Sequence, residues 1–571
     1  MSMSDASATL PADRGSDEAT ISVAELVGAA LARLGVGHAF GVVGSGNFAV
    51  TNALVASGVP YTAARHEGGA ATMADAFARM SGTVAVLSVH QGCGLTNATT
   101  GIGEAAKSRT PLLVLAAETA GAAVNSNFAM DQAGLARSVG AVPERVHSAG
   151  SALADVTRAF RTAQNGRRTV VLNLPLDVQA ARVPHTELAR LTSVVPDAPT
   201  RPAASAVDEL VALIQVAERP VIIAGRGGRG AGPQLRILAE RAGALLATSA
   251  VANGLFEGDP FALGISGGFS TPLAAELIAG SDLIIAFGCA LNMWTMRHGM
   301  LIGEDAQVVQ VDDEAAALGA HRPIALGVVG DAAETAAAVS DALAARGVPP
   351  RGIRTPELAE RIRTAGRWND TPTPDLSSVD RIDPRVFSAA LDAVLPTERI
   401  VSIDSGNFMG YPSQYLRVPD ERGFCFTQSF QSIGLGLATA IGAALAQPGR
   451  LPVLGTGDGG FLMAVSELET AVRLGLPLVI AVYNDASYSA EVHHFAEAAP
   501  GSDLSTVVFP DTDLAAIARG YGARGVTVRS VEDLADVRRW LDDEPNAPIV
   551  LDVKIASDGG AWWLHEAFKG H

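Results

Sequence analysis

The sequence contains few cysteines, few charged residues and no excess of basic ones. Its three cysteines, Cys93, Cys289 and Cys425, stand far apart in a chain of 571 residues. This spacing excludes a disulfide framework and a cysteine-based zinc site, and it favours a reducing compartment. The chain has 42 basic and 60 acidic residues, for a formal net charge of −18. Because a nucleic-acid-binding protein needs a basic face, we expect no nucleic-acid partner, although a small anion can still bind in a local positive pocket.

Long apolar runs are also missing. No uninterrupted apolar stretch reaches the roughly 18 residues that a membrane-spanning helix needs. Residues 1–20 are polar and acidic and lack the basic-then-apolar order of a signal peptide. The sequence therefore predicts no membrane partner, a cytoplasmic location and a disordered tail over residues 1–20.

Apolar residues nevertheless make up 48% of the chain, in short runs rich in branched side chains. Residues 84–89, 220–224 and 478–482 are examples, and such runs alternate with glycine-rich turns and amphipathic stretches. This alternation predicts an α/β fold of mainly parallel sheets flanked by helices. The proline-rich stretches 184–202 and 348–384 are typical of linkers, so we expect three such units.

The strongest motif is Gly455–Gly460, which follows a predicted strand over 452–454. The next predicted strand, 478–483, ends in Asn484-Asp485-Ala486-Ser487. Because parallel strands end at the same edge of a sheet, Asp458 and Asp485 can converge on one hard cation. Few oxygen ligands suit Mg²⁺ completed by water and a diphosphate, and the glycines allow a phosphate to approach the backbone. The alternative is a pair of acidic turn residues beside a helix cap.

A second motif is Arg65-His66-Glu67-Gly68-Gly69, which leads into a helix predicted over 72–79. Glu67 stands among glycine, alanine and methionine residues. In such surroundings a carboxyl should have a raised pKa and can share a proton with a ring nitrogen. The alternative is a solvated glutamate stabilised by the helix dipole.

These two motifs have the order and separation seen in thiamine-diphosphate enzymes of the acetolactate synthase, benzaldehyde lyase and 2-hydroxyacyl-CoA lyase type. The chain resembles that family from about residue 22 onward. Three further segments are similar to family segments: Phe40–Gly44, the Gly-x-Gly-x-Thr-Asn turn Gly92–Asn97, and the strand end Val309–Asp312.

The resemblance implies a pyrimidine-binding domain over 21–185, a middle domain over 203–345 and a diphosphate-binding domain over 384–555. A C-terminal lid over 556–571 would follow, since Trp562, Trp563 and Phe568 make that tail too apolar to lie free. Docking on the core or at a subunit interface is the alternative. The family binds its cofactor between two subunits, so a homodimer is the minimum active unit, and we expect a homotetramer.

The same resemblance implies roles for particular residues. Glu67 would contact the aminopyrimidine ring of thiamine diphosphate and help to activate the cofactor. Asp458, Asp485 and the carbonyl of Ser487 would bind Mg²⁺, with Asp485 where the family usually has asparagine. Ile433 aligns with an apolar wedge that bends the cofactor, although core packing is the alternative. The other expected cofactor contacts are Gly406, Asn407, Gln431 through its carbonyl, Gly457, Gly459, Gly460 and Tyr488.

One glycine-rich motif points elsewhere. Gly225–Gly230 satisfies a dinucleotide-binding pattern, but the acidic residue that should follow at the next strand end, near 245–249, is missing. NAD is therefore not expected. Arg226 and Arg229 suit a phosphate of CoA, ADP or flavin, and a solvated loop is the alternative.

The reaction is predicted from the middle domain. Gly288–Trp294, followed by His298-Gly299, resembles a stretch of oxalyl-CoA decarboxylases and 2-hydroxyacyl-CoA lyases, with Ala290 in place of an arginine. This favours a lyase that cleaves a 2-hydroxyacyl-CoA, a CoA thioester, into a carbonyl compound and formyl-CoA. The alternatives are an acetolactate synthase-type carboligase acting on pyruvate and a cofactor-binding protein without catalysis.

Glu491 is the second expected catalytic residue. It follows the metal-binding loop, where a carboxylate can take the substrate's hydroxyl proton and return a proton to carbon. A surface carboxylate at a helix start is the alternative. Expected substrate contacts are Asn47, Gln91, Arg226, Asn292, Trp294, Arg297, His298 and Trp562.

Overall fold

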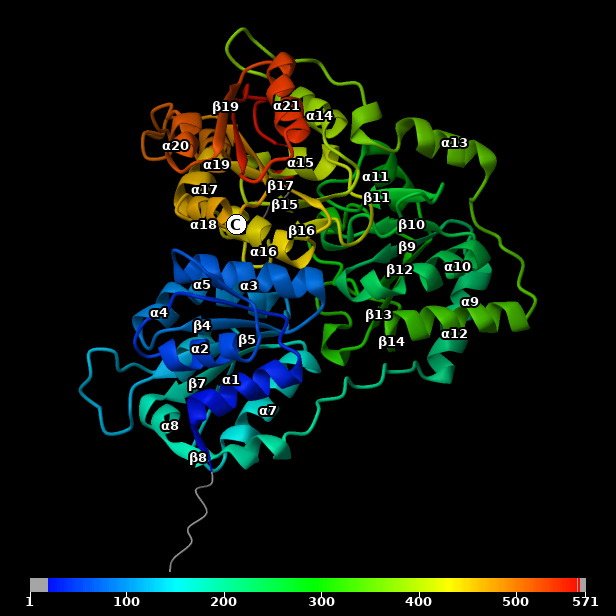
Figure 1. Cartoon of the computed structure of the whole chain (residues 1–571). Helices are drawn as coiled ribbons and strands as arrows, with labels where there is room; N and C mark the ends of the chain where they lie inside the picture. Colours follow the sequence, from blue (N-terminus) through cyan, green and yellow to red (C-terminus); the bar gives the residue numbers. More distant parts are fainter. Residues whose placement is uncertain (1–18, 562, 565–571) are drawn as a thin grey trace, which may run out of the picture.

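The computed structural model describes residues 19–561, 563 and 564 (Figure 1). The predicted disordered tail lies almost wholly outside the described residues, as does Trp562. Three six-stranded sheets form the framework, and every neighbouring pair of strands within them is parallel. The predicted α/β fold of parallel sheets flanked by helices is therefore confirmed.

The first sheet has the order β3-β2-β4-β5-β7-β6. Its strands are β2 (His38–Gly41), β3 (Tyr61–Ala63), β4 (Ala85–Val89), β5 (Leu112–Glu118), β6 (Val142–Arg145) and β7 (Thr169–Pro175). A two-stranded antiparallel pair, β1 (Thr20–Ser22) and β8 (Arg182–Pro184), ties the two ends of this domain together. The helices of the domain are α1 (Val23–Leu34), α2 (Phe48–Ala56), α3 (Glu67–Ser81), α4 (Cys93–Asn97), α5 (Thr99–Lys107), α6 (Gln132–Ser138), α7 (Ala152–Gln164) and α8 (Leu176–Ala180).

The middle sheet has the order β11-β10-β9-β12-β13-β14. The chain begins with β9 near the centre, adds β10 and β11 on one side, and then adds β12, β13 and β14 on the other. Its strands are β9 (Pro220–Ala224), β10 (Leu245–Thr248), β11 (Ala262–Ile265), β12 (Leu283–Phe287), β13 (Gln307–Asp312) and β14 (Leu326–Val329). Its helices are α9 (Ala204–Val216), α10 (Gly232–Ala242), α11 (Pro272–Ala279) and α12 (Ala332–Ala345).

The third sheet, β16-β15-β17-β18-β20-β19, repeats the strand order of the first. Its strands are β15 (Arg399–Ile403), β16 (Phe424–Phe426), β17 (Leu451–Gly457), β18 (Val479–Asn484), β19 (Arg524–Val528) and β20 (Ile549–Lys554). Its helices are α14 (Pro384–Val394), α15 (Gly410–Tyr415), α16 (Gly436–Ala446), α17 (Asp458–Ala464), α18 (Glu467–Arg473), α19 (Ser489–Ala498), α20 (Leu514–Gly520) and α21 (Ala535–Asp542). The first and third domains therefore share one topology.

Two sequence-based boundaries were wrong. The linker predicted over 348–384 contains α13 (Pro356–Ala365), because the Thr355 side chain accepts from the Leu358 N–H and proline suits a first helical position. The helix predicted to begin at Thr72 begins at Glu67, because the His66 ring nitrogen accepts from the Gly68 N–H. Glu67 thus lies in the first turn of α3.

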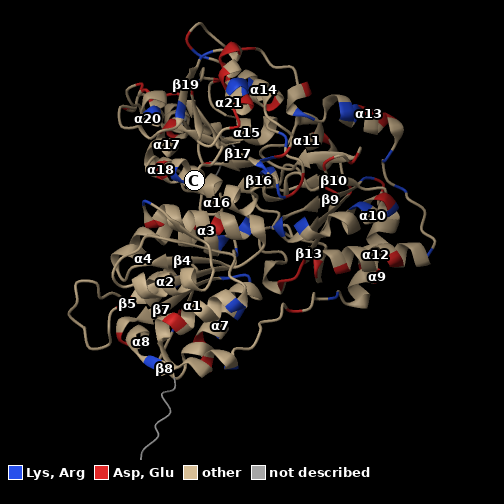
Figure 2. Ribbon diagram, in the orientation of Figure 1, with Lys and Arg blue, Asp and Glu red and all other residues tan. Residues whose placement is uncertain are grey.

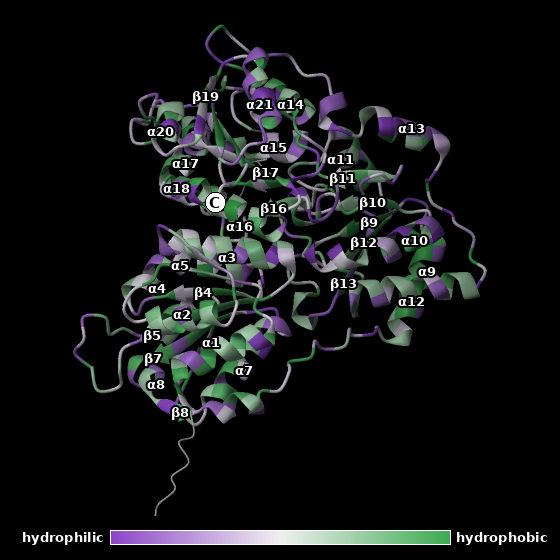
Figure 3. Ribbon diagram, viewed as in Figure 1, coloured by the Kyte–Doolittle hydropathy of each residue, from purple (hydrophilic) through white to green (hydrophobic). Residues whose placement is uncertain are grey.

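Charge and hydropathy follow the expected pattern. Acidic and basic residues are interspersed over the ribbon (Figure 2). Hydrophobic residues concentrate on the strands and on the helices between them (Figure 3). Within the described part of the chain, no helix combines the length and apolar character needed to cross a membrane.

The first and third domains meet through α3 and α16 (Figure 1). These helices approach closely at Gly442, where a Cβ atom would lie 2.2 Å from the Met73 carbonyl oxygen. Next to this contact Arg79 donates to Asp75 at 2.6 Å and to Glu104 at 2.8 Å, and all three side chains are at least nine-tenths buried.

The Arg79 cluster also crosses the domain boundary. Arg79 donates to the Phe426 carbonyl at 3.0 Å, and the Glu104 carboxylate accepts from the Ser429 and Phe430 N–H groups at 3.0 and 2.6 Å. Burial alone would raise the pKa of Glu104, but Arg79 and these two donors bring it below its usual range. Each charge in the cluster is therefore compensated.

We expect Arg79→Met to destabilise the protein strongly, because Asp75 and Glu104 would remain buried without a counter-charge. Removing one partner of a buried ion pair typically costs about 3–5 kcal/mol. The apparent unfolding temperature measures the effect. Arg190→Met is the control, since Arg190 pairs with Glu187 while 74% exposed, and such pairs contribute less than about 1 kcal/mol. Equal shifts in the two variants would contradict the prediction.

Candidate active site

A cavity of about 120 Å³ opens where β15, β17 and β18 end. The site residues expected in the third domain line it, with the exception of Gln431. Gln431 lies two residues before Ile433 and has a left-handed backbone with φ +57°. The wall consists of Ser405, Gly406, Asn407, Phe408, Ile433, Gly457, Asp458, Gly459, Gly460, Tyr483, Asp485, Ser487, Tyr488, Ser489, Ala490 and Glu491.

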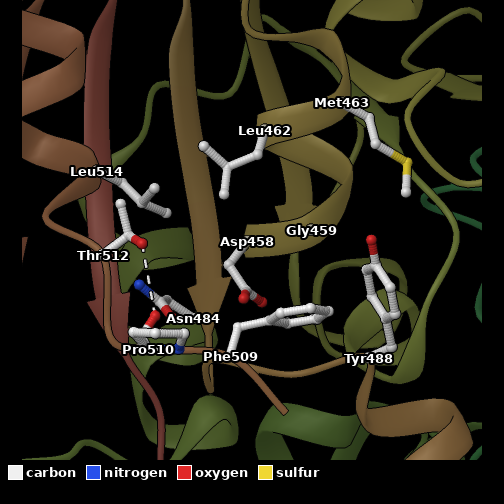
Figure 4. A pocket seen from close by; sticks show the side chains of 10 residues that line it. All are labelled: Asp458, Gly459, Leu462, Met463, Asn484, Tyr488, Phe509, Pro510, Thr512 and Leu514. Carbon is white, nitrogen blue, oxygen red and sulfur yellow. Dashed lines mark hydrogen bonds between the residues drawn. The ribbon is translucent and has the colours of Figure 1, made fainter. Parts of the chain in front are cut away.

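A second cavity, of about 310 Å³, lies against Asp458 and Tyr488 as well. Figure 4 shows the Asp458 carboxyl pointing into the space between Leu462, Phe509 and Tyr488. Leu462 and Phe509 are each 39% exposed. The Asp458 carboxyl therefore borders both cavities.

The two predicted metal ligands are buried acids. Burial, with a contribution from Asp485, raises the pKa of Asp458 to about 7. Burial also raises the pKa of Asp485, whose carboxylate accepts from the Ser489 hydroxyl and, at 3.3 Å, from the Ser487 hydroxyl. Among the described residues neither acid forms an ion pair with a basic side chain. Two buried carboxyls without a counter-charge fit a divalent cation.

The glycines of the motif form a cradle. A Cβ atom on Gly459 would lie 2.4 Å from the Tyr488 ring, and one on Gly460 would lie 2.4 Å from the Asp404 carboxylate. Gly406 has a φ of +144°, which other residues rarely adopt. Side chains are therefore excluded where a diphosphate would need to approach the backbone, and the fit to thiamine diphosphate holds on this point too.

Asp404 holds the cavity together, and the sequence analysis did not assign it an individual role. Its buried carboxylate accepts from the Ser405 and Gly434 N–H groups at 2.8 and 3.0 Å and from the Thr456 hydroxyl at 3.0 Å. It thereby joins the ends of β15 and β17 to the loop that carries Ile433. The available signal was an acid placed directly after a strand.

Glu67 lies on the first domain, at the N-terminus of α3. Its half-buried carboxylate accepts from the Asn97 side chain at 3.0 Å. The loop before it is fixed by Glu467 of α18, which accepts from the Arg65 and His66 N–H groups at 3.0 Å. Glu67 is not among the residues that line the Asp458 cavity in the described part of the chain. One chain therefore presents the two motifs separately.

Two of the expected substrate contacts lie near Glu67. Asn47 is buried and supports its loop, accepting from the Gly44 N–H at 2.8 Å and donating to Ser88 at 3.0 Å. Gln91 is 4% exposed, and its side-chain oxygen has no hydrogen-bond partner among the described residues. A Cβ atom on Gly46 would lie only 1.7 Å from that oxygen. Their contacts with a substrate stay predictions.

The expected substrate contacts in the middle domain lie elsewhere. Asn292, Trp294, Arg297 and His298 line neither the Asp458 cavities nor the one around Arg226. Trp294 packs against Phe269 at 5.3 Å between ring centroids, and Arg297 donates to the Gly267 carbonyl at 3.0 Å. These side chains hold a middle-domain loop, and the structure does not bring them together with Asp458.

Arg226 lines a separate cavity of about 780 Å³ at the junction of the three domains. It makes no hydrogen bond or ion pair among the described residues, and burial lowers its pKa to about 10. Further arginines also border this cavity: Arg79, Arg109, Arg167, Arg229 and Arg422.

The C-terminal segment docks on the third domain. Trp563 is 3% exposed and packs edge-on against Phe269 and Tyr411. The Ala561 N–H donates to the Asn407 side chain at 3.2 Å, so this segment contacts the wall of the Asp458 cavity. Residues 562 and 565–571 of the predicted lid lie outside the described residues, and its action as a lid stays a prediction.

Comparison with known proteins identifies the family. Residues 21–135, 207–339 and 404–553 match the N-terminal TPP binding, central and C-terminal TPP binding domains of thiamine pyrophosphate enzymes. The chain belongs to this family. It is therefore a thiamine pyrophosphate (thiamine diphosphate)-dependent enzyme, and the predicted resemblance is confirmed at this level.

Several relatives of this enzyme carry different names. It is 29% identical over 542 residues to the sulfoacetaldehyde acetyltransferase of Rhodobacter capsulatus, covering 90% of each chain. It is 30% identical over 545 residues to a probable 2-ketoarginine decarboxylase of Pseudomonas aeruginosa, covering 91% of each. It is 29% identical over 542 residues to the acetolactate synthase of Bacillus subtilis, covering 93% of each.

We expect Asp458→Asn to lose Mg²⁺-dependent binding of thiamine diphosphate, because the diphosphate charge would be poorly offset. In the wild-type protein the apparent Mg²⁺ affinity should also fall as the pH drops through about 7, since the raised pKa of Asp458 means that the cation must displace a proton. Calorimetric titration at several pH values measures both effects. Asp503→Asn, at an exposed loop position, is the control, and unchanged binding in Asp458→Asn would exclude Asp458 as a ligand.

Proposed function

We propose that this thiamine-diphosphate enzyme, with Mg²⁺, cleaves the carbon–carbon bond beside the carbonyl of a small 2-oxo acid and passes the acyl group to an acceptor, as a carboligase of the acetolactate synthase type. The observation that carries this proposal is the position of Trp294 and Arg297. These residues belong to the stretch that suggested an acyl-CoA substrate, and they hold a middle-domain loop without lining either cavity beside Asp458. The relatives named acetolactate synthase and 2-ketoarginine decarboxylase support the same choice.

In this proposal the cofactor supplies the nucleophilic carbon and the electron sink for bond cleavage. Asp458, Asp485 and the Ser487 carbonyl hold Mg²⁺, and the Gly459–Gly460 cradle receives the diphosphate. Glu67 holds a proton at the pyrimidine ring and keeps its carboxylate oriented through Asn97. These roles follow from the family resemblance together with the burial and hydrogen bonds described above.

Glu491 is proposed to supply a proton to the acceptor's carbonyl oxygen. It lies in the first turn of α19, half-buried, in the wall of the cavity that contains Asp458 and Asp485. When the electron-rich carbon attacks the acceptor, a carboxyl group in this position can protonate the acceptor's carbonyl oxygen and then recover its proton from solvent. Its place in the cavity wall favours this role over that of a surface carboxylate.

We also propose that the active unit is a homodimer and that two dimers form a homotetramer. Glu67 does not line the cavities that contain Asp458, and apolar side chains are exposed beside each motif. Met463 is 54% exposed near Asp458, while Phe128 and Met130 are 43% and 39% exposed on the first domain. A second chain would cover these surfaces and join the two half-sites.

A second candidate function is the 2-hydroxyacyl-CoA lyase, which the Arg226 cavity favours. A buried guanidinium without an ion pair among the described residues, in a cavity lined by five further arginines as well as by Asp312, Asp313, Glu314 and Glu421, suits the phosphates of a CoA nucleotide. A substrate panel with thiamine diphosphate and Mg²⁺ separates the two functions. It should compare pyruvate, 2-ketoarginine and sulfoacetaldehyde with 2-hydroxyacyl-CoAs. Turnover of 2-hydroxyacyl-CoAs alone would overturn the 2-oxo acid proposal.

We expect Glu491→Ala to lower kcat on the best 2-oxo acid by about 10²-fold, the usual effect of losing an acid–base group. The affinity for thiamine diphosphate, measured by titration, should stay unchanged. Glu532→Ala, at an exposed position of the same domain, is the matched control. A Glu491→Ala enzyme that works at the wild-type rate would remove Glu491 from the mechanism.

We expect the mass of the purified protein by light scattering to be two or four times 58.5 kDa. Met463→Asp should shift it toward the monomer and weaken cofactor binding, because a carboxylate would be desolvated in the interface. The exposed-site variant Val379→Asp is the control, since Val379 is 94% exposed on the linker before α14. A wild-type enzyme that is active as a monomer would contradict the shared site.

A further inference from the structure

Ser45 and His90 form a hydrogen-bonded pair on the first domain, outside the residues discussed so far. His90 follows β4, and Ser45 lies in the loop after β2, so both stand at the edge where the parallel strands end. The Ser45 hydroxyl oxygen lies 3.4 Å from Nε2 of His90. Nδ1 of the same ring lies 2.9 Å from the Gln91 carbonyl oxygen.

These two contacts fix the tautomer of His90. A carbonyl oxygen only accepts hydrogen bonds, so Nδ1 must carry the hydrogen. In the neutral ring Nε2 then has a free lone pair, which faces the Ser45 hydroxyl. The Ser45 hydroxyl thus lies beside a base, the His90 ring, whose orientation is set by the Gln91 carbonyl. Nucleophile and proton-transfer sites require such an arrangement.

The imidazole ring is held in place by its neighbours. Phe128 packs edge-on against it at 4.9 Å between centroids. A Cβ atom on Gly44 would lie 2.6 Å from the ring, so the loop passes close to it. Asn47 fixes that loop through the Gly44 N–H. The pair is therefore built into the scaffold.

The pair lies beside Glu67. Gly94 separates them, since a Cβ atom there would be 3.2 Å from the His90 Cβ and 3.4 Å from the Glu67 carboxylate. Ser45 is exposed and His90 is half-buried, so the hydroxyl is accessible. A substrate that reaches a cofactor activated by Glu67 would thus come within reach of Ser45.

We propose that Ser45 and His90 relay a proton between the imidazole and the reacting oxygen of the substrate. When the product is released, its hydroxyl proton passes to Ser45 Oγ while the Ser45 proton passes to Nε2, leaving an imidazolium. When the next substrate is attacked, Nε2 returns that proton through Ser45 to the carbonyl oxygen. No net proton is gained or lost over a cycle, and the Gln91 carbonyl stabilises the charged ring through Nδ1.

This inference rests on the proposed function, and it divides the proton transfers between two groups. Glu491 protonates the oxygen of the acceptor, and the Ser45–His90 pair exchanges a proton with the oxygen of the 2-oxo acid. The two come from different domains, so a substrate between two subunits would have one group on each side.

The tautomer can be tested without turnover. Cys93 is exposed, Cys289 and Cys425 are buried, and the Cys93 sulfur lies 4.0 Å from Nδ1 of His90. Because Nδ1 already carries a hydrogen, it cannot accept the thiol proton. We expect His90→Gln to lower the rate of Cys93 alkylation by iodoacetamide less than fivefold in the full-length protein. A fall of fivefold or more would make Nδ1 the base and overturn the relay.

A measurement on the wild-type protein covers the case in which that variant does not fold. With ¹⁵N-labelled histidine, the side-chain nitrogen spectrum should show His90 protonated at Nδ1, and Ser45→Ala should shift its Nε2 signal. Protonation at Nε2 in the neutral ring would overturn the proposal.

The kinetic test distinguishes a proton relay from the alternative in which Ser45 and His90 each have only a structural role. Ser45→Ala and His90→Gln should each lower kcat about 10²-fold with unchanged thiamine diphosphate affinity. The double variant should lose at most threefold more than either single one, because both remove the same step. Ser45→Thr, which keeps the hydroxyl, should retain at least a third of kcat. His147→Gln, at a surface histidine of the same domain, is the control.

The relay would be overturned if the kcat losses of the two single variants multiply in the double variant. It would also be overturned if either single variant keeps a kcat within threefold of the wild type. A wild-type enzyme that turns over nothing in the substrate panel would refute the proposed function instead. The alkylation and ¹⁵N measurements would then still decide the tautomer.

Discussion

The buried contact between Arg79 and Glu104 is the constraint on which the arrangement of the first and third domains depends. Glu104 satisfies two N–H groups in the segment between β16 and α16, and Arg79 reaches the last carbonyl of β16. The first and third domains of one chain are therefore held together through α3 and α16. In that arrangement Glu67 does not line the cavity that contains Asp458. The proposal that a second chain completes the site rests on this separation.

Part of this protein could be predicted from the sequence because the signals were local. Gly457–Gly460 follows a strand directly, and a parallel sheet brings Asp485 to the same edge, so their convergence required only the strand order. The start of α3 and the presence of α13 were missed because each depends on a single cap, at His66 and Thr355. A cap residue is a weak signal beside glycines or prolines that suggest a loop.

The missed residues have a different cause. Ser45 and His90 are 45 positions apart, and their contact depends on the distance between two loops that no periodicity encodes. Arg297 and His298 were assigned ligand contacts because a familiar string of residues suggested them, and those contacts stay predictions. Both have left-handed backbones, with φ of +45° and +53°. These residues turn the chain tightly at this point, and the Arg297 side chain donates hydrogen bonds to the neighbouring loop.

The contact between Gly46 and Gln91 has a consequence for how substrate preference can change in this fold. Because the Gln91 side chain occupies the space that any Cβ at position 46 would need, the two positions compete for one volume. A larger residue at 46 is accommodated only if position 91 becomes smaller, and the polar group predicted to contact the substrate then moves from one loop to the other. The two positions therefore have to change together, because a larger residue at position 46 alone would clash with Gln91 and a smaller residue at position 91 alone would leave its space unfilled.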